Sequence, residues 1–262
     1  MSEHRPDTSP VPYRLNAAAR LQASAVKQAL YDVCFDIRCK LEPCISMGEV
    51  NLPLDARVSR PLRKAISQGI YEQNEMDIVS KTLEVKDRVL ECGAGIGLLS
   101  AYCALRVGSD KVTTIEANPF MAPLIFHTFA LNHVRPELVI GAIGRAHGRI
   151  DFHVRRNFWA SSSHPDRADG AVQTLSVPVI PLDEEVRRWK PTYLFIDIEG
   201  AEESLVGCSE LPGVTKIMAE VHPELIGDTG VEAFLKWLRG LGFVRDNALS
   251  KEREFFLRRN LS

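Results

Sequence analysis

Hydrophobic and polar positions change their spacing repeatedly after residue 74, and the changes predict strands that alternate with helices. Apolar residues at helical spacing predict helices over 75–83, 98–107 and 119–132. Short apolar runs predict strands over 88–92, 111–115 and 137–144. Strands that alternate with helices of this length indicate a parallel sheet built from right-handed crossovers.

The pattern continues into the C-terminal half, where four more strands are predicted: 149–154, 176–180, 192–198 and 215–221. A helix is predicted over 230–242. The segments FVRD (243–246) and EFFLRR (254–259) follow it on either side of a polar turn. We expect these two segments to form an antiparallel hairpin at the edge of the sheet.

The N-terminal part follows a different pattern. Residues 1–14 are rich in proline, and 14–37 combine good helix formers with apolar residues on one face. Residues 44–69 alternate imperfectly and contain Pro53 and Pro61, which predicts short edge strands and turns. We therefore divide the chain into an N-terminal extension, 1–68, and a main domain, 69–262.

The composition is that of an ordinary globular protein: 262 residues, 45% hydrophobic and 25% charged. The formal net charge of -2 provides no broad basic field, so nucleic acid is not an expected partner. The N-terminus lacks the apolar core of a secretory signal, and the longest weakly polar run, 89–107, contains charges and three glycines. We expect a cytoplasmic protein that does not enter a membrane, and a homo-oligomer is left open.

The six cysteines do not predict a disulfide framework in a chain of this length. Cys34, Cys39 and Cys44 are spaced five apart, whereas structural zinc sites normally use closer pairs of cysteines and a fourth ligand. Chance placement explains this spacing better than a zinc site.

A strand-to-helix junction, VLECGAGIGLLS (89–100), carries glycine at alternate positions: Gly93, Gly95 and Gly97. Glycine permits a tight turn and a close approach to the main chain. The dinucleotide fingerprint G-x-G-x-x-G/A requires a small third residue, and Leu98 occupies that position, which disfavours a pyrophosphate ligand. The alternative is that the glycines only allow the chain to turn.

Acidic residues follow several of the predicted strands, where α/β proteins bind ligands. These strand ends carry Glu91, Glu116, Asp197, Glu199, Glu220 and His222. A carboxylate at Glu116 is suited to accept both hydroxyls of a ribose. A ligand with an adenosine ribose, a positive centre and no phosphate fits glycines flanked by acids, and S-adenosylmethionine is such a ligand.

Five motifs resemble, in order and spacing, the FkbM family of S-adenosylmethionine-dependent methyltransferases: LECGAGIGLLS, TIEANP, IPLDEE, LFIDIEGAE and AEVHPE. GIYEQNE, ahead of the glycines, resembles the family's entry segment. The resemblance covers residue 69 to the C-terminus, and DIEGAE is its most specific part. Cys92 is a minor departure that should leave the turn intact.

The resemblance implies an α/β fold with a Rossmann-like seven-stranded methyltransferase sheet, here with an N-terminal helical and edge-strand extension. It also implies methyl transfer from S-adenosylmethionine, usually to an oxygen of a sugar or secondary metabolite. By position, the residues expected around the methionine part are Glu91, Gly93, Ala94, Gly95 and Gly97. Those expected near the ribose and adenine are Glu116, Ala117, Ala142 and Ile143, and Glu72 and Asp197 complete the cofactor site.

Methyl transfer to an alcohol needs alignment of the reacting atoms and a group that takes the hydroxyl proton. We predict that Asp197 and His222 orient the acceptor or act as the base, with Glu199 and Glu202 beside them. Glu202 could instead cap a helix, and His222 could be an ordinary loop histidine. Asp197 is the stronger candidate because an acid directly after the apolar run YLFI is costly to bury without a partner.

The expected acceptor is a small hydroxylated molecule, with Tyr71, Trp159 and Glu202 as substrate-binding residues. Trp159 lies in the polar segment 157–170, which could form a lid or a plain surface loop. Acids and a histidine at the strand ends suit a divalent metal, but the sequence does not show that they converge, so no metal is assigned. The rival functions are a nucleotide-dependent oxidoreductase and a noncatalytic binding protein.

Overall fold

The computed structural model describes residues 44–54, 58–154, 173–208 and 210–259. These residues form one compact unit. The helix predicted within 14–37 and the 157–170 segment with Trp159 lie outside the described residues, and the boundary after residue 68 stays a prediction.

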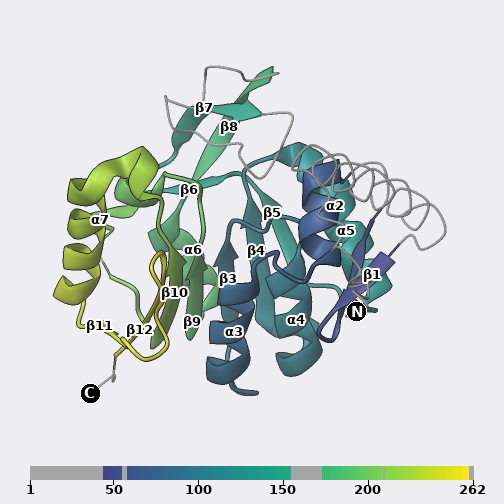
Figure 1. Cartoon of the computed structure of the whole chain (residues 1–262). Coiled ribbons are helices and arrows are strands. Elements are labelled where there is room, and N and C mark those ends of the chain that lie inside the picture. Colours follow the sequence, from purple (N-terminus) through teal and green to yellow (C-terminus); the bar gives the residue numbers. More distant parts are fainter. Residues whose placement is uncertain (1–43, 55–57, 155–172, 209, 260–262) are drawn as a thin grey trace, which may run out of the picture. The chain divides into compact units, whose positions relative to one another are not determined.

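A seven-stranded sheet forms the centre of this unit, in the order β11-β12-β10-β9-β3-β4-β5 (Figure 1). Its strands are β3 (Val89–Cys92), β4 (Val112–Glu116), β5 (Glu137–Ile140), β9 (Tyr193–Ile196), β10 (Lys216–Glu220), β11 (Val244–Arg245) and β12 (Glu254–Arg258). The five from β10 to β5 are parallel, and β12 and β11 continue the sheet in antiparallel pairing. The predicted parallel sheet and its C-terminal edge hairpin are confirmed.

Helices cover both faces of this sheet. The predicted helices are confirmed as α3 (Gln73–Thr82), α4 (Leu98–Val107) and α5 (Ala122–Leu131). Two short 3₁₀ turns accompany them: η1 (Ser109–Lys111) before β4 and η2 (Pro119–Met121) before α5. Alternate residues of the central strands face opposite sides. Leu90 and Leu194 pack in one buried cluster with Val186 of α6 (Leu182–Trp189) and Phe234 of α7 (Pro223–Gly240). The neighbouring strand positions point to the face that α3 and α4 cover (Figure 1).

Three helical features differ from the predictions. A helix, α2 (Arg60–Ser67), occupies part of the segment expected to hold only strands and turns; Pro61 lies in its first turn, where the missing N–H costs nothing, and Ser59 caps it. Helix α6 was not predicted, although its first turn is acidic and its last turn basic, as the helix dipole favours. Helix α7 begins before residue 230 and bends at Gly227.

The strand predicted over 137–144 is two strands in two sheets. The chain leaves the large sheet at Gly141, and β6 (Ala142–Gly144) pairs instead with β8 (Gln173–Pro181), which also pairs with β7 (Gly148–Val154). A Cβ at Gly141 would lie 2.5 Å from the side chain of Ile180, so glycine permits this departure. The small sheet stands at the end of the large one (Figure 1).

The edge strands predicted before the main sheet are present as a separate hairpin of β1 (Cys44–Met47) and β2 (Val50–Pro53). Asn132, directly after α5, holds this hairpin through hydrogen bonds to both the N–H and the carbonyl of Asn51. None of the helices that the structure describes has the length and apolar character needed to span a bilayer.

Candidate functional site

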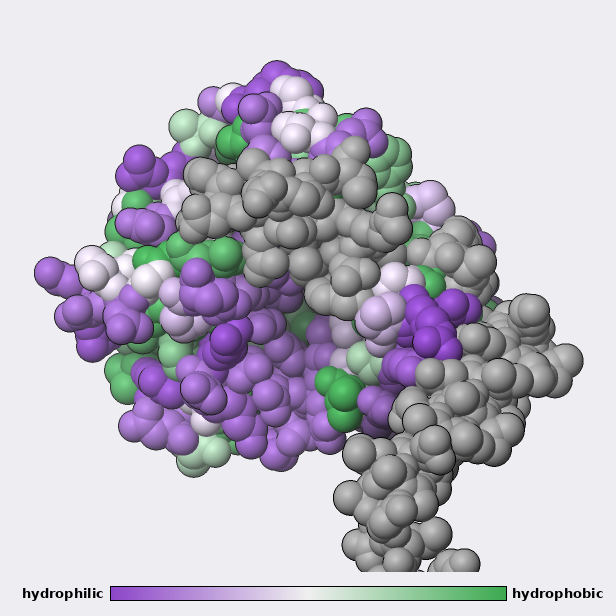
Figure 2. Space-filling view, turned by 45° about the horizontal axis from the view of Figure 1, so that its top comes forward, coloured by the Kyte–Doolittle hydropathy of each residue, from purple (hydrophilic) through white to green (hydrophobic). Residues whose placement is uncertain are grey.

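A cavity of about 1090 Å³ opens where the carboxyl ends of β3, β4, β9 and β10 meet. The order of the sheet reverses between β3 and β9, and open α/β sheets bind ligands at such a point. The loop before α3, residues of the small sheet and residues of α2, α3, α7 and β12 complete its walls. Among the coloured residues of the face that comes forward in Figure 2, hydrophilic ones prevail, with smaller hydrophobic patches between them.

The three glycines after β3 each face atoms of the protein itself. A Cβ at Gly93, where φ is 94°, would lie 1.6 Å from the carbonyl oxygen of Asp197. A Cβ at Gly95 would lie 2.6 Å from the hydroxyl of Tyr71, and one at Gly97 would lie 3.2 Å from the ring of Phe129. The alternate spacing therefore lets three neighbouring segments approach the turn. Gly93 and Gly95 also border the cavity.

Glu116 ends β4 with its carboxylate at the cavity wall. Its Oε2 accepts a hydrogen bond from the N–H of Ala94 at 3.1 Å, and its Oε1 accepts one from the N–H of Asn118 at 2.7 Å. Burial raises the pKa of Glu116 to about 7, although these backbone donors oppose the shift. Ala117 and Ala142 border the same part of the cavity, together with Ile143.

Glu91 and Gly97 do not border the cavity. Glu91 points to the α4 face of the sheet, where its carboxylate accepts a hydrogen bond from the hydroxyl of Ser100, and burial raises its pKa to about 7. Gly97 is the N-cap residue of α4 and lies against Phe129 and Ile125 of α5. Ala94 takes part in the site through its backbone N–H, which donates a hydrogen bond to the carboxylate of Glu116.

Tyr71 and Glu72 close the cavity from the loop before α3. Glu72 has a positive φ of 45°, an uncommon conformation for a residue with a side chain. The two side chains hydrogen-bond to each other, and burial is the main cause that raises the pKa of both groups. The pair lies against the glycine turn, because a Cβ at Gly95 would lie 2.6 Å from the hydroxyl of Tyr71 and 3.0 Å from Oε1 of Glu72.

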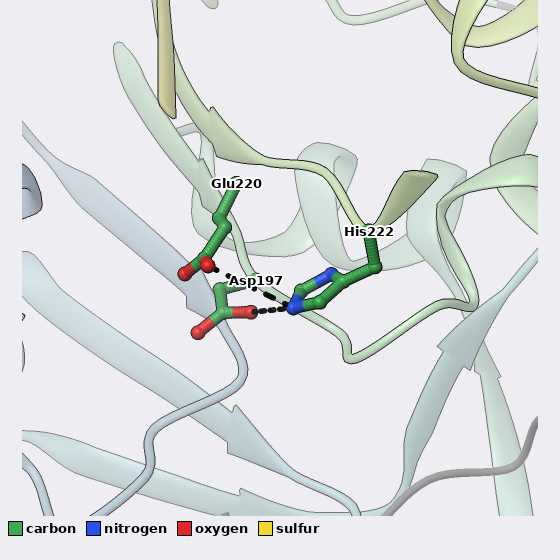
Figure 3. Close-up of side chains that lie close together, drawn as sticks. All are labelled: Asp197, Glu220 and His222. Atoms are coloured by element: carbon green, nitrogen blue, oxygen red, sulfur yellow. Dashed lines mark ion pairs between the residues drawn. The ribbon is translucent and has the colours of Figure 1, made fainter. Parts of the chain in front are cut away.

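His222 lies at the centre of an acidic cluster at the ends of β9 and β10, and its residue is only 4% exposed. Its Nδ1 is 2.9 Å from Oε1 of Glu202, which is fully buried and also accepts the N–H of Gly200. Its Nε2 faces oxygens of Glu199 at 3.6 Å, Glu220 at 3.8 Å and Asp197 at 3.9 Å. Asp197 and Glu220 point toward the imidazole from neighbouring strands (Figure 3).

The charges in this cluster shift one another. Burial lowers the pKa of His222, but the hydrogen bond to Glu202 and the charges of Asp197 and Glu202 outweigh it, so the pKa is raised above 6.5. Burial, followed by the charge of Glu199, raises the pKa of Asp197 well above its ordinary value. The predicted residues Asp197, Glu199, Glu202 and His222 are thus brought together, with Glu202 behind the histidine and outside the cavity wall.

Three acids of the cavity wall were not singled out from the sequence: Glu75, Glu203 and Glu254. Glu75 of α3 hydrogen-bonds to Glu220, and Glu254 of β12 accepts a hydrogen bond from Asn74. Burial, with the charges of Asp197 and Glu75, raises the pKa of Glu220 to about 11. Glu75 belongs to the GIYEQNE motif, which was a usable signal, whereas the edge hairpin offered none for Glu254.

The sheet order and the cavity at its reversal point define a Rossmann-like methyltransferase fold. The family description "Methyltransferase FkbM domain" matches residues 91–245. The chain therefore belongs to the FkbM methyltransferase family, as the sequence motifs predicted. No curated protein matches the chain.

Several solved structures are similar to this chain at low identity. A methyltransferase FkbM from Methylobacillus flagellatus KT is 14% identical with a TM-score of 0.45, over 90% of this chain and 60% of that one. A fibrillarin from Aeropyrum pernix, solved with natively bound S-adenosyl-L-methionine, is 11% identical with a TM-score of 0.40, over 67% and 68%. A precorrin-6y C5,15-methyltransferase from Geobacter metallireducens GS-15 is 10% identical with a TM-score of 0.38, over 71% and 85%.

Proposed function

We propose that this protein transfers a methyl group from S-adenosylmethionine to a hydroxyl oxygen of a small acceptor, such as a sugar-containing or other natural-product intermediate. Membership of the FkbM family supports methyl transfer. The observation that carries the proposal further is one cavity whose wall carries Glu116, at the end of β4, and the Asp197 and Glu199 carboxylates, after β9, with β3 between these two strands. We call the part beside Glu116 the donor end and the part beside Asp197 and Glu199 the acceptor end.

The donor end has the chemistry that an adenosyl group requires. The carboxylate of Glu116 accepts hydrogen bonds from backbone N–H groups, including those of Ala94 and Asn118, and it borders the cavity as an acceptor for the hydroxyls of a ribose. Ala142 and Ile143 offer a small, apolar surface for adenine, and Gly93 and Gly95 border the space assigned to the methionine part. S-adenosylmethionine, when bound, supplies an activated methyl group on a positive sulfonium, a charge that the acidic walls favour.

The acceptor end has groups that can hold a hydroxyl and take its proton. Asp197 and Glu199 are half-buried carboxylates, and the raised pKa of Asp197 makes its carboxylate a stronger base than an ordinary aspartate. Glu202 fixes the ring of His222 through Nδ1, so that Nε2 faces the same carboxylates. Tyr71 and Glu72 border the cavity beside this end and limit the access of water. Trp159 stays a prediction for acceptor binding.

Calorimetric titration with S-adenosylmethionine, S-adenosylhomocysteine and NAD tests the donor. We expect binding of the first two, and tight NAD binding with neither of the others would overturn the proposal. Glu116→Ala should weaken cofactor binding strongly, whereas Asp197→Ala should mainly slow transfer. Equal, negligible effects of the two substitutions would contradict both assignments.

Turnover with a panel of hydroxylated acceptors separates an enzyme from a noncatalytic binding protein. An O-methylated product is expected, and an N- or C-methylated product would correct the acceptor atom. A cytoplasmic location and the absence of a nucleic-acid partner remain predictions from the composition.

A further inference from the structure

The meeting point of Asp197, Glu220 and His222 has an arrangement that hydrogen bonding within the described chain does not explain. The side chain of His222 is 6% exposed, and its Nδ1 is already engaged by Glu202. Its Nε2 faces carboxylate oxygens of Glu199, Glu220 and Asp197 at distances of 3.6–3.9 Å. These separations exceed the roughly 2.7–3.2 Å of a hydrogen bond.

A buried oxygen faces this nitrogen. Oδ1 of Asp197 is inaccessible to solvent and has no hydrogen-bond partner among the described residues. It is also the atom that lies 3.9 Å from Nε2 of His222. Buried polar atoms are normally satisfied by a protein group, a water or an ion. An imidazole nitrogen and a buried, unpartnered oxygen that face each other beyond hydrogen-bonding distance therefore indicate a shared partner between them.

The distances suit a metal ion as that partner. Ligand atoms of Asp197, Glu220 and His222 all lie within 4.8 Å of one another. First-row divalent ions bind imidazole nitrogen and carboxylate oxygen at about 2.0–2.2 Å. Two ligand atoms bound to one ion at a wide angle are therefore separated by roughly the 3.8–3.9 Å found between Nε2 of His222 and the oxygens of Glu220 and Asp197.

A second group of acids, Glu75, Glu220 and Glu254, also brings its oxygens together, but it contains no imidazole. Glu220 belongs to both groups and shares a hydrogen bond with Glu75, and Glu254 accepts one from Asn74. Only the set that includes His222 combines an orphaned buried oxygen with an imidazole whose other nitrogen is fixed by a carboxylate. A carboxylate behind the histidine is the usual support of a metal-binding imidazole.

We propose that Asp197, Glu220 and His222 bind a divalent metal ion through two carboxylate oxygens and Nε2, with Glu202 as the residue that positions the imidazole. A mixed nitrogen and oxygen ligand set suits first-row ions such as Mn²⁺ better than Ca²⁺. Asp197 and Glu220 border the cavity, so the ion would be within reach of a ligand there. Its role in holding the acceptor oxygen and lowering the pKa of the hydroxyl rests on the proposed function.

Mn²⁺ titration of the EDTA-treated, desalted full chain, followed by electron paramagnetic resonance, tests the site. We expect one bound ion per chain, with spin-echo modulation from a histidine nitrogen. Asp197→Asn and His222→Asn should each weaken Mn²⁺ binding at least tenfold. Glu254→Gln is the matched control, because it removes a carboxylate from the same cavity wall outside the proposed ligand set, and it should change the affinity less than twofold.

The native protein decides the question even where a variant does not fold, which circular dichroism would reveal. Failure to bind Mn²⁺, or a bound ion without histidine modulation, would overturn the site. Equal weakening by Glu254→Gln and Asp197→Asn would also overturn it, since it would indicate diffuse attraction to negative charge. S-adenosylhomocysteine titrated into the metal-free protein separates the two proposals: its binding without any Mn²⁺ binding removes the metal site and leaves the proposed function standing.

Discussion

Gly93→Ala tests whether the glycine turn is specified by the chain's own approach to it. The new Cβ would begin 1.6 Å from the carbonyl oxygen of Asp197, and real Cβ contacts do not fall below 3.0 Å. The end of β9 must therefore move away, and that movement strains the hydrogen bond from the N–H of Asp197 to the carbonyl of Cys92. A residue with a Cβ at this positive φ costs about 1–3 kcal/mol, and a lost hydrogen bond about 1 kcal/mol.

We therefore expect Gly93→Ala to lower the free energy of unfolding by about 2–4 kcal/mol, the sum of these two costs. Gly97→Ala is the matched control: its φ is also positive, but the nearest atom is a ring carbon of Phe129 at 3.2 Å, so only the backbone cost of about 1–2 kcal/mol applies. Urea denaturation followed by circular dichroism measures both variants. Equal losses, or a smaller loss for Gly93→Ala, would refute the reasoning.

Three further predictions concern single carboxylates. The pKa of Glu116 is raised to about 7 and ribose hydroxyls need its ionised form, so calorimetry should show S-adenosylhomocysteine binding about tenfold more weakly at pH 6 than at pH 8, with Glu116→Gln removing the difference. Glu202→Ala leaves the buried Nδ1 of His222 without its acceptor, and urea titration should show a loss of about 2–4 kcal/mol. Asp87→Ala breaks a buried ion pair with Lys216 remote from the cavity; it should cost about 3–5 kcal/mol and leave cofactor affinity unchanged within twofold.

The local pattern of the sequence predicts the elements that depend on local spacing. The helix over 98–107 is found at those residues, and the alternating strands form the parallel sheet as expected. Gly141 shows the limit of such a pattern, because the departure of β6 depends on the approach of Ile180 from a distant strand. Helix α2 was missed because Pro61 was interpreted as a strand breaker, whereas a proline also fits a first helical turn.

The candidate site also combines features that the local sequence predicts with features that only the folded chain creates. The strand-end acids were predicted because the carboxyl ends of parallel strands meet at one edge, and Asp197 and His222 do lie together. The partners of the glycines could not be predicted, since Tyr71 and Phe129 reach the turn only in the folded chain. Nor could the sequence show that Glu254 from the antiparallel edge strand joins the cavity wall.

A crystal structure of the protein grown with S-adenosylhomocysteine tests the central claim most directly. The account predicts that the nucleoside occupies the cavity, with both ribose hydroxyls within hydrogen-bonding distance of the Glu116 carboxylate. A nucleoside bound elsewhere, or a cavity filled by the protein's own side chains in the presence of saturating ligand, would contradict it.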